Sequence, residues 1–274
     1  MAPSFVRSIS FPTTPGRSSS KPRHIRSVSL PACTATFCHP LLADLKAHIA
    51  AVRSLTNYSL AASLSHIHAL HSSIADLLVL PELQNALCGG VAAERLIQAF
   101  LLLADAHQGF QESLVDLKHA VTESSAALRR GDATRAASAT RSQPNAEKEL
   151  SRLAASVSTV YSKCARLHLV GTEDAEMAGA LMEAAAASAA ASADVFSAAA
   201  SMSSSSAQAS SCKKVISVFG SFGKKAIPET AKRSLERLHA LEQCFDECDD
   251  VCQKVFRSIV QTRVLLLNIM SAAI

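Results

Sequence analysis

Two short stretches near the start of the sequence have the residue types and the spacing of phosphorylation sites. They are RSISFP at residues 7–12 and RSVSLP at residues 26–31, and both follow the pattern Arg-Ser-x-Ser-x-Pro. In each stretch an arginine lies three residues before a serine, which is the spacing that basophilic kinases use. The residues that would carry this chemistry are Arg7, Ser10, Pro12, Arg26, Ser29 and Pro31.

A phosphate on either serine would create a ligand for an arginine cluster on a partner protein. The pattern resembles the phosphoserine ligand of 14-3-3 proteins, in which a proline turns the chain away after the phosphate. Ser10 and Ser29 lie 19 residues apart, a flexible separation of roughly 25 Å, so both can bind one dimer and gain about 10²–10⁴ in avidity. We therefore predict that this segment docks to protein partners such as 14-3-3 proteins.

The same segment fits two other interpretations. A leader that is rich in serine, contains arginine and lacks acidic residues is also typical of a transit peptide that is removed in the chloroplast. It fits equally a solvated tail in which the repeat is a coincidence. We favour docking, because two copies of a six-residue pattern are more than targeting requires.

Three cysteines, Cys244, Cys248 and Cys252, recur at helical spacing, and thiols can bind metals or react with oxidants. The sequence contains no CxxC pair and the nearest histidine is His239, so a four-ligand zinc site would need donors from another helix. We interpret Cys248 and Cys252 as core residues and expect reduced thiols.

Histidines and acidic residues form two further clusters. In HIHALH only His68 and His71 can point to the same side of a helix, and we expect core or boundary histidines there and at His107. The run ECDD at residues 247–250 is expected to be a solvated helix face. GSFGKK at residues 220–225 lacks the spacing of a phosphate-binding loop, and no GxSxG or HExxH motif occurs. We therefore predict that the chain is not an enzyme and has no metal site and no cofactor.

The positive charge of the chain belongs to its first segment. Residues 1–43 hold five Lys and Arg and no acidic residue, whereas the remaining residues hold 22 Lys and Arg against 23 Asp and Glu. Nucleic-acid binding needs Lys and Arg on a folded face, often with stacking aromatics, and aromatic residues make up only 4% of this chain. The composition therefore argues against a nucleic-acid partner.

Prolines divide the chain into two regions. Six of the nine lie in the first 40 residues among many serines and threonines, so we predict a disordered basic tail over residues 1–39 and a helical bundle domain over residues 40–274. The other three, Pro81, Pro144 and Pro228, are predicted to begin helices, because proline fits the first helical turn.

Apolar residues step by three and four through most of the second region, which is the period of an α-helix. Such stripes occupy residues 60–78, 96–121 and 150–167, and a heptad seam typical of a coiled coil occupies residues 238–269. The segment 181–211 is rich in alanine and serine. We expect it to be a thinly packed helix that gives way to a flexible link near residues 203–211.

These elements predict an all-α fold, an elongated up-and-down bundle of about four to six long amphipathic helices with a disordered N-terminal tail. Apolar residues surround more than one face of residues 256–270, so we expect this last helix to be central. Glu183 and Asp194 argue against a membrane span in the alanine-rich segment, and the final VLLLNIMSAAI is too short for one. We therefore predict no transmembrane span.

Four stretches of the chain share their order and spacing with a known family. They are RHIRSVSLP at residues 23–31, SIADLLVLPELQNAL at 73–87, LKHAVTESSAALRR at 117–130 and VFRSIVQTRVLLLNI at 255–269. With them the chain resembles, nearly end to end, the plant-specific uncharacterised-domain family related to BYPASS, and it departs from that family in the alanine-rich segment. The resemblance implies a non-enzymatic helical protein associated with root and shoot development, with no catalytic residues to carry over.

The sequence therefore predicts a cytoplasmic interaction or regulatory protein of plant development with a phosphorylatable N-terminal arm. The alternative is a chloroplast protein with the same bundle, whose N-terminal segment is a cleaved transit peptide.

Overall fold

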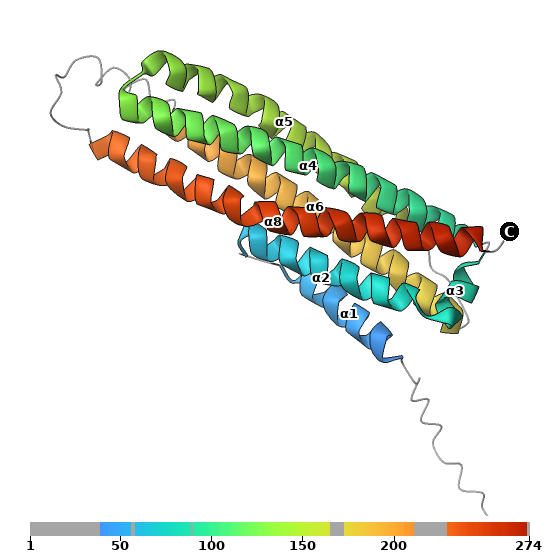
Figure 1. Ribbon diagram of the computed structural model, residues 1–274. Helices are drawn as coiled ribbons and strands as arrows, with labels where there is room; N and C mark the ends of the chain where they lie inside the picture. Colours follow the sequence, from blue (N-terminus) through green and yellow to red (C-terminus); the bar gives the residue numbers. More distant parts are fainter. Residues whose placement is uncertain (1–38, 56–57, 89, 165–172, 211–228, 273–274) are drawn as a thin grey trace, which may run out of the picture. The chain divides into compact units, whose positions relative to one another are not determined.

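Seven α-helices make up most of the chain that the computed structural model describes, which comprises residues 39–55, 58–88, 90–164, 173–210 and 229–272. The helices are α1 (Pro40–Arg53), α2 (Leu60–Leu78), α3 (Pro81–Leu87), α4 (Val91–Arg130), α5 (Ala133–Cys164), α6 (Glu173–Ser210) and α8 (Glu229–Ser271). No strand occurs in the described ranges. Five of the helices have 19 to 43 residues, which confirms the prediction of an all-α bundle of long helices (Figure 1).

Two of the helix starts show why the chain becomes helical where it does. The Oγ atom of Ser59 accepts the N–H of Ala62 at 3.2 Å, which replaces a hydrogen bond that the first turn of α2 lacks. α3 begins at Pro81, as predicted. Pro228 lies outside the described residues, and α8 begins at the next residue, Glu229.

Two residues, Gly131 and Asp132, connect the long helices α4 and α5. Gly131 has φ 71° and ψ 21°, the left-handed conformation that glycine adopts without strain. The N–H groups of both residues bond back to carbonyls in the last turn of α4, which ends that helix. The Oδ1 atom of Asp132 then accepts the N–H groups of Thr134 and Arg135, each at 3.1 Å, and so caps the start of α5.

Replacing Gly131 by alanine is expected to lower the free energy of unfolding by about 1 kcal/mol, because alanine is strained in the left-handed conformation. The matched change Gly179→Ala in α6 is expected to raise it by about 0.5–1 kcal/mol, because alanine favours a helix. A Cβ atom added at Gly179 would meet no atom within 4 Å. Urea denaturation followed by circular dichroism measures the free energy of unfolding of both variants. Shifts of the same sign in the two variants would contradict the assignment of a left-handed conformation to Gly131 and a helical one to Gly179.

One predicted helix boundary is wrong, because Pro144 lies inside α5 and does not begin a helix. A proline in a helix interior lacks the N–H that closes a backbone hydrogen bond, at a cost of roughly 3 kcal/mol. Packing of α5 against α4 and α6 offsets this cost, with Ala139 and Leu150 buried on either side of the proline.

α6 is the helix that holds the bundle together, since it contacts each of the other six described helices. In Figure 1 it runs behind α8, between the pair α4 and α5 and the pair α1 and α2. Most of its buried residues are alanines, including all four of residues 184–187. Their small side chains let neighbouring helices approach closely, so the helix that we expected to be thinly packed is enclosed.

The expectation that the last helix is central is therefore wrong. α8 packs mainly against α2 and α4, and it leaves part of its apolar surface exposed. The helical conformation of α6 continues to Ser210, through most of the segment 203–211 for which we predict a link. Serine is compatible with this extension because its hydroxyl can donate to the carbonyl four residues earlier, as Ser201 does to Ser197 at 2.9 Å.

The predicted apolar stripes form the core. The stripe residues of α2, α4 and α5 are buried up to Cys164, and position 167 lies outside the described residues. The seam of α8 is buried as well, apart from Leu241, which is half-buried. The largest fully buried side chains are those of Phe100, Phe110, Phe196 and Phe245.

Candidate functional site

The six residues predicted to carry phosphorylation and docking lie within residues 1–38, outside the part of the chain that the structure describes. Their role stays a prediction. The sequence also holds a third copy of the pattern, RSSSKP at residues 17–22. There Arg17 lies three residues before Ser20 and Pro22 two residues after it. The three consecutive serines hide this copy, but a search for Arg-Ser-x-Ser-x-Pro finds it.

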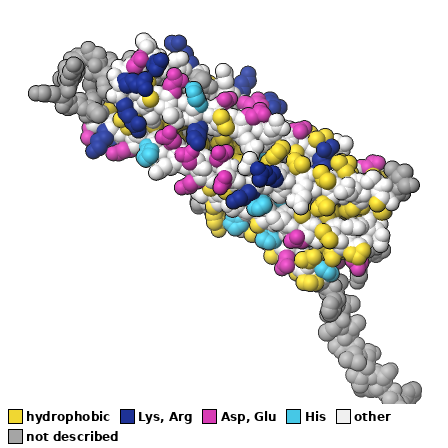
Figure 2. Space-filling view, viewed as in Figure 1, with side chains coloured by type: hydrophobic (Ala, Val, Ile, Leu, Met, Phe, Trp, Pro, Cys, Tyr) yellow, Lys and Arg dark blue, Asp and Glu magenta, His cyan; other side chains and the backbone are white. Residues whose placement is uncertain are grey.

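Apolar side chains are exposed along one face of α8. Val260, Val264 and Leu267 follow one another at helical spacing and keep 37%, 48% and 40% of their surface exposed; we call them the α8 stripe. Figure 2 shows apolar side chains over the right-hand part of the molecule, where the C-terminal half of α8 lies, and charged side chains mostly over the left-hand part. Exposed apolar surface of this kind is typical of protein-binding surfaces.

Two histidines link α2 and α4 to the central helix α6. The Nε2 atom of His71 lies 2.8 Å from the Oγ atom of Ser188, and the Nε2 atom of His107 lies 2.9 Å from the Oγ atom of Ser192. All four side chains are fully buried. Burial lowers the pKa of both imidazoles to about 3, with a further contribution at His71 from the other nearby histidines. Both rings are therefore neutral at pH 7, and the prediction of core histidines is confirmed.

The side chain of His68 turns to a different helix. Its Nδ1 atom lies 3.4 Å from the Oγ atom of Ser258 in α8, whereas the hydrogen bond of His71 reaches α6. The pair therefore does not converge on a common ligand. Within the described ranges, no group of three or more His, Cys, Asp or Glu side chains could hold a metal ion. The GSFGKK stretch at residues 220–225 is not among the described residues.

The cysteine row of α8 lies where its seam packs into the bundle. Cys248 and Cys252 are buried, as predicted, and Cys244 is half-buried. The hydrogen bond between the thiols of Cys244 and Cys248 lowers the pKa of Cys244, whereas burial raises the pKa of Cys252 to about 12. The acidic residues of the run at 247–250 are exposed, as predicted.

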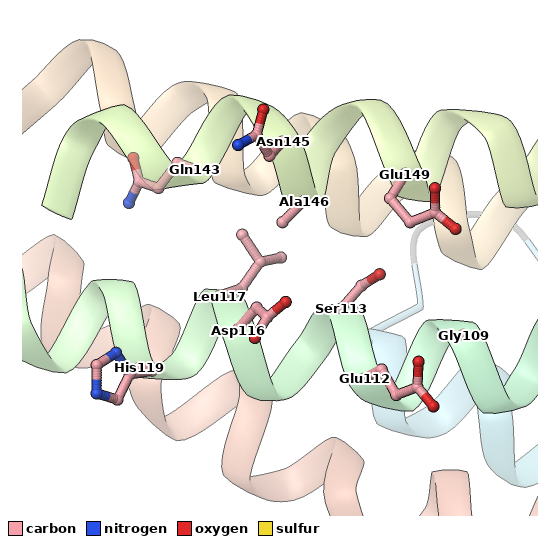
Figure 3. A pocket seen from close by; sticks show the side chains of 10 residues that line it. All are labelled: Gly109, Glu112, Ser113, Asp116, Leu117, His119, Gln143, Asn145, Ala146 and Glu149. Carbon is pink, nitrogen blue, oxygen red and sulfur yellow. The ribbon is translucent and has the colours of Figure 1, made fainter.

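A cavity of about 510 Å³ lies between α4 and α5, and its lining is largely polar. Figure 3 shows the side chains of Ser113 and Leu117 pointing from α4 toward α5, the helix that carries Gln143. Gln143 is 1% exposed, and neither atom of its side-chain amide has a hydrogen-bond partner. A buried amide without partners is costly, and this amide is enclosed by the packing of α4 and α5.

The cavity is lined by three carboxylates. Glu112 and Asp116 lie on the exposed surface of α4, and Glu149 comes from α5. Arg152 binds both oxygens of Glu149, at 2.9 Å through Nε and at 2.5 Å through Nη2, and this hydrogen bonding lowers the pKa of the Glu149 carboxyl. In the described structure no arginine or lysine pairs with Glu112 or Asp116 as Arg152 pairs with Glu149. The lining of the cavity therefore carries their negative charge.

Sequence reasoning did not find this cavity. The prediction that Pro144 begins a helix places Gln143 outside the helix. In the structure the helix runs through this position and buries the side chain of Gln143. A polar residue at an apolar position of a continuous α5 would have been the signal.

Within the described ranges, no single helix has the length and apolar composition needed to cross a membrane. α3 and α4 meet that test only when taken together, and they are bent by 97° at their junction.

The family model described as Protein BPS1 matches residues 63–269 of the chain, from α2 into the end of α8. No curated protein and no solved structure matches the chain.

Proposed function

Because the chain belongs to the BPS1 family of BYPASS-related proteins, we propose that it is a non-enzymatic regulatory protein of plant root and shoot development. It acts in the cytoplasm by binding other proteins. Its N-terminal segment is a phosphorylatable arm, and its helical bundle is the folded part that partners recognise.

The observation that carries this proposal is the repeated Arg-Ser-x-Ser-x-Pro pattern of the N-terminal segment. A phosphoserine with an arginine before it and a proline after it is a ligand for arginine clusters, and a chain with more than one copy suits a dimeric reader such as a 14-3-3 protein. The α8 stripe supports the wider proposal, because it offers a partner exposed apolar surface on the bundle itself.

Phosphorylation of Ser10 and Ser29 is expected to raise the affinity of the full chain for a 14-3-3 dimer by about 10²–10⁴ over either single site. The test uses chain phosphorylated by a basophilic kinase, with Ser20→Ala in every sample so that the third copy cannot substitute. Ser10→Ala and Ser29→Ala should each remove the avidity, and Ser19→Ala is the matched control that should not. Equal affinities for all of these variants would contradict the docking proposal.

The chloroplast alternative rests on the acid-free, serine-rich composition of the same segment. The intact mass and the phosphorylation sites of protein recovered from plant cells decide between the two. A retained N-terminus with phosphate on Ser10 and Ser29 supports the cytoplasmic arm. A chain that begins near His39 supports the transit peptide and ends the docking proposal for the mature protein.

A further inference from the structure

We propose that a second cavity, beside the start of α4 and the end of α5, binds a small amphipathic anion, a carboxylate that carries an apolar chain. This inference concerns only the helical bundle, so it stands or falls independently of the N-terminal arm. It rests on the size of the cavity, on two cations that meet there without a counterion, and on the accessible apolar surface between them.

The register of α4 against α5 explains where this cavity lies. Gly109 of α4 lies against the side chain of Leu153 of α5. Counted from this contact along the two antiparallel helices, Cys164 at the end of α5 lies level with Gln98, so the first turns of α4 continue past that end (Figure 1). The cavity at this place has a volume of about 880 Å³, which falls in the usual range of ligand sites, roughly 300–1,000 Å³.

Two cations from different helices meet at this cavity. Arg95 of α4 and Lys163 of α5 are exposed, and both line it. Both also lie near the thiol of Cys164: burial raises the pKa of this thiol, and the charges of Arg95 and Lys163 oppose that rise. In the described ranges neither cation forms an ion pair with a carboxylate. Two like charges that share a cavity without a counterion attract an anion.

One carboxylate, that of Glu94, belongs to the same lining. It precedes Arg95 in the sequence, but within the described structure it forms no ion pair with Arg95 or with Lys163. The lining therefore holds two positive charges against one negative charge. Glu94 weakens the attraction for an anion and does not cancel it.

The surface between the cations suits an apolar chain. Leu102 of α4 is half-buried, so part of its side chain is open to a ligand. The alkyl stems of Arg95 and Lys163 add apolar surface below their charged ends. The exposed side chains of Gln98 and Thr159 can donate hydrogen bonds to carboxylate oxygens. Every group that would hold the ligand is thus accessible to it.

Octanoate is the probe that tests the proposal, and 1-octanol is its matched neutral control. Isothermal titration of the full chain, below the concentration at which octanoate forms micelles, is expected to show saturable binding. Octanoate should bind roughly four- to twentyfold tighter than 1-octanol, because each of two exposed ion pairs contributes about two- to fivefold. Hexanoate lacks two methylene groups and should bind about tenfold more weakly than octanoate. A titration without saturation, or equal affinity for octanoate and either control, would overturn the proposal.

Four charge changes locate the binding. Arg95→Gln and Lys163→Gln should each weaken octanoate binding roughly two- to fivefold, whereas Glu94→Gln removes the opposing charge and should strengthen it by up to about the same factor. Lys148→Gln makes the same charge change at an exposed position of α5 outside this lining and should leave binding unchanged. Equal weakening by the two lysine variants would show that only the overall charge of the bundle attracts the anion and would overturn the proposal.

Methionine methyl signals show where the ligand lies. Met182 of α6 belongs to the lining of the cavity, whereas Met270 lies on α8, outside it. In protein labelled with ¹³C at its methionine methyl groups, the signal that is lost in Met182→Leu should shift as octanoate is added. The signal that is lost in Met270→Leu should not shift. An unchanged Met182 signal, or equal shifts of the two signals, would place the ligand elsewhere and overturn the proposal.

Discussion

Acidification from about pH 7.5 to about pH 4.5 is expected to lower the free energy of unfolding by about 5 kcal/mol, through His71 and His107 alone. In the folded protein burial holds the pKa of both imidazoles at about 3, so they stay neutral over this range. In the unfolded chain each imidazole has the ordinary histidine pKa of 6.5 and takes up a proton near that pH. Below that pH the unfolded state binds more protons, so falling pH favours unfolding.

Urea denaturation at several pH values measures the slope of the free energy of unfolding against pH. Each histidine should contribute up to about 1.4 kcal/mol per pH unit to this slope. The variants His71→Gln and His107→Gln should each reduce the slope by about 1.4 kcal/mol per pH unit, whatever they do to stability at neutral pH. The double variant should retain only the contribution of the remaining groups. A slope in the parent protein that is unchanged in the double variant would show that the two imidazoles are not its source.

Truncation of Phe196 is expected to destabilise the bundle by about 3–5 kcal/mol, because Phe196→Ala leaves a cavity that its neighbours cannot fill. Phe196 is fully buried on α6. Its ring stacks on Phe110 with centroids 4.5 Å apart, and it lies against His107 with centroids 5.2 Å apart. The surrounding α6 residues are largely alanines, which are too short to move into the space.

The matched control for this truncation is Val115→Ala on α4, where the side chain is 61% exposed. That change should alter the free energy of unfolding by less than about 0.5 kcal/mol. Urea denaturation of both variants gives the comparison. A loss of less than about 1 kcal/mol in Phe196→Ala would mean that α6 shifts to close the cavity, and that its alanines do not fix the spacing of the bundle.

The helices of this protein are readable from sequence because their core residues repeat with the period of a helix. The long stripe of α4 shows this well: its apolar residues keep one face for the whole of Val91–Arg130, and Gly131 ends it where a left-handed residue is needed. Pro144 was misread because the local preference of a proline for a helix start is weaker than the packing of the helix around it.

The arrangement of the helices was harder to infer than their existence. Hydrophobicity placed α8 at the centre, but the helix that contacts all of the others is the alanine-rich α6. The close approach of neighbouring helices to α6 depends on its small side chains. A hydrophobicity scale that ranks residues by their apolar surface gives alanine a low rank and so undervalues such a helix. The cavity beside Gln143 was also hard to infer, since it forms from two helices whose register no single stretch of sequence defines.

The late position of α6 in the chain has a consequence during synthesis on the ribosome. The side chains that tie α1 and α2 to α6 pair over long separations, 130 residues for Lys46 with Glu176 and 117 for His71 with Ser188. At translation rates of about 5–20 residues per second, the first helices wait on the order of 10 s before α6 is made. α2 and α4 also pack against α8, the last helix of the chain, so the bundle is completed only after both α6 and α8 have left the ribosome.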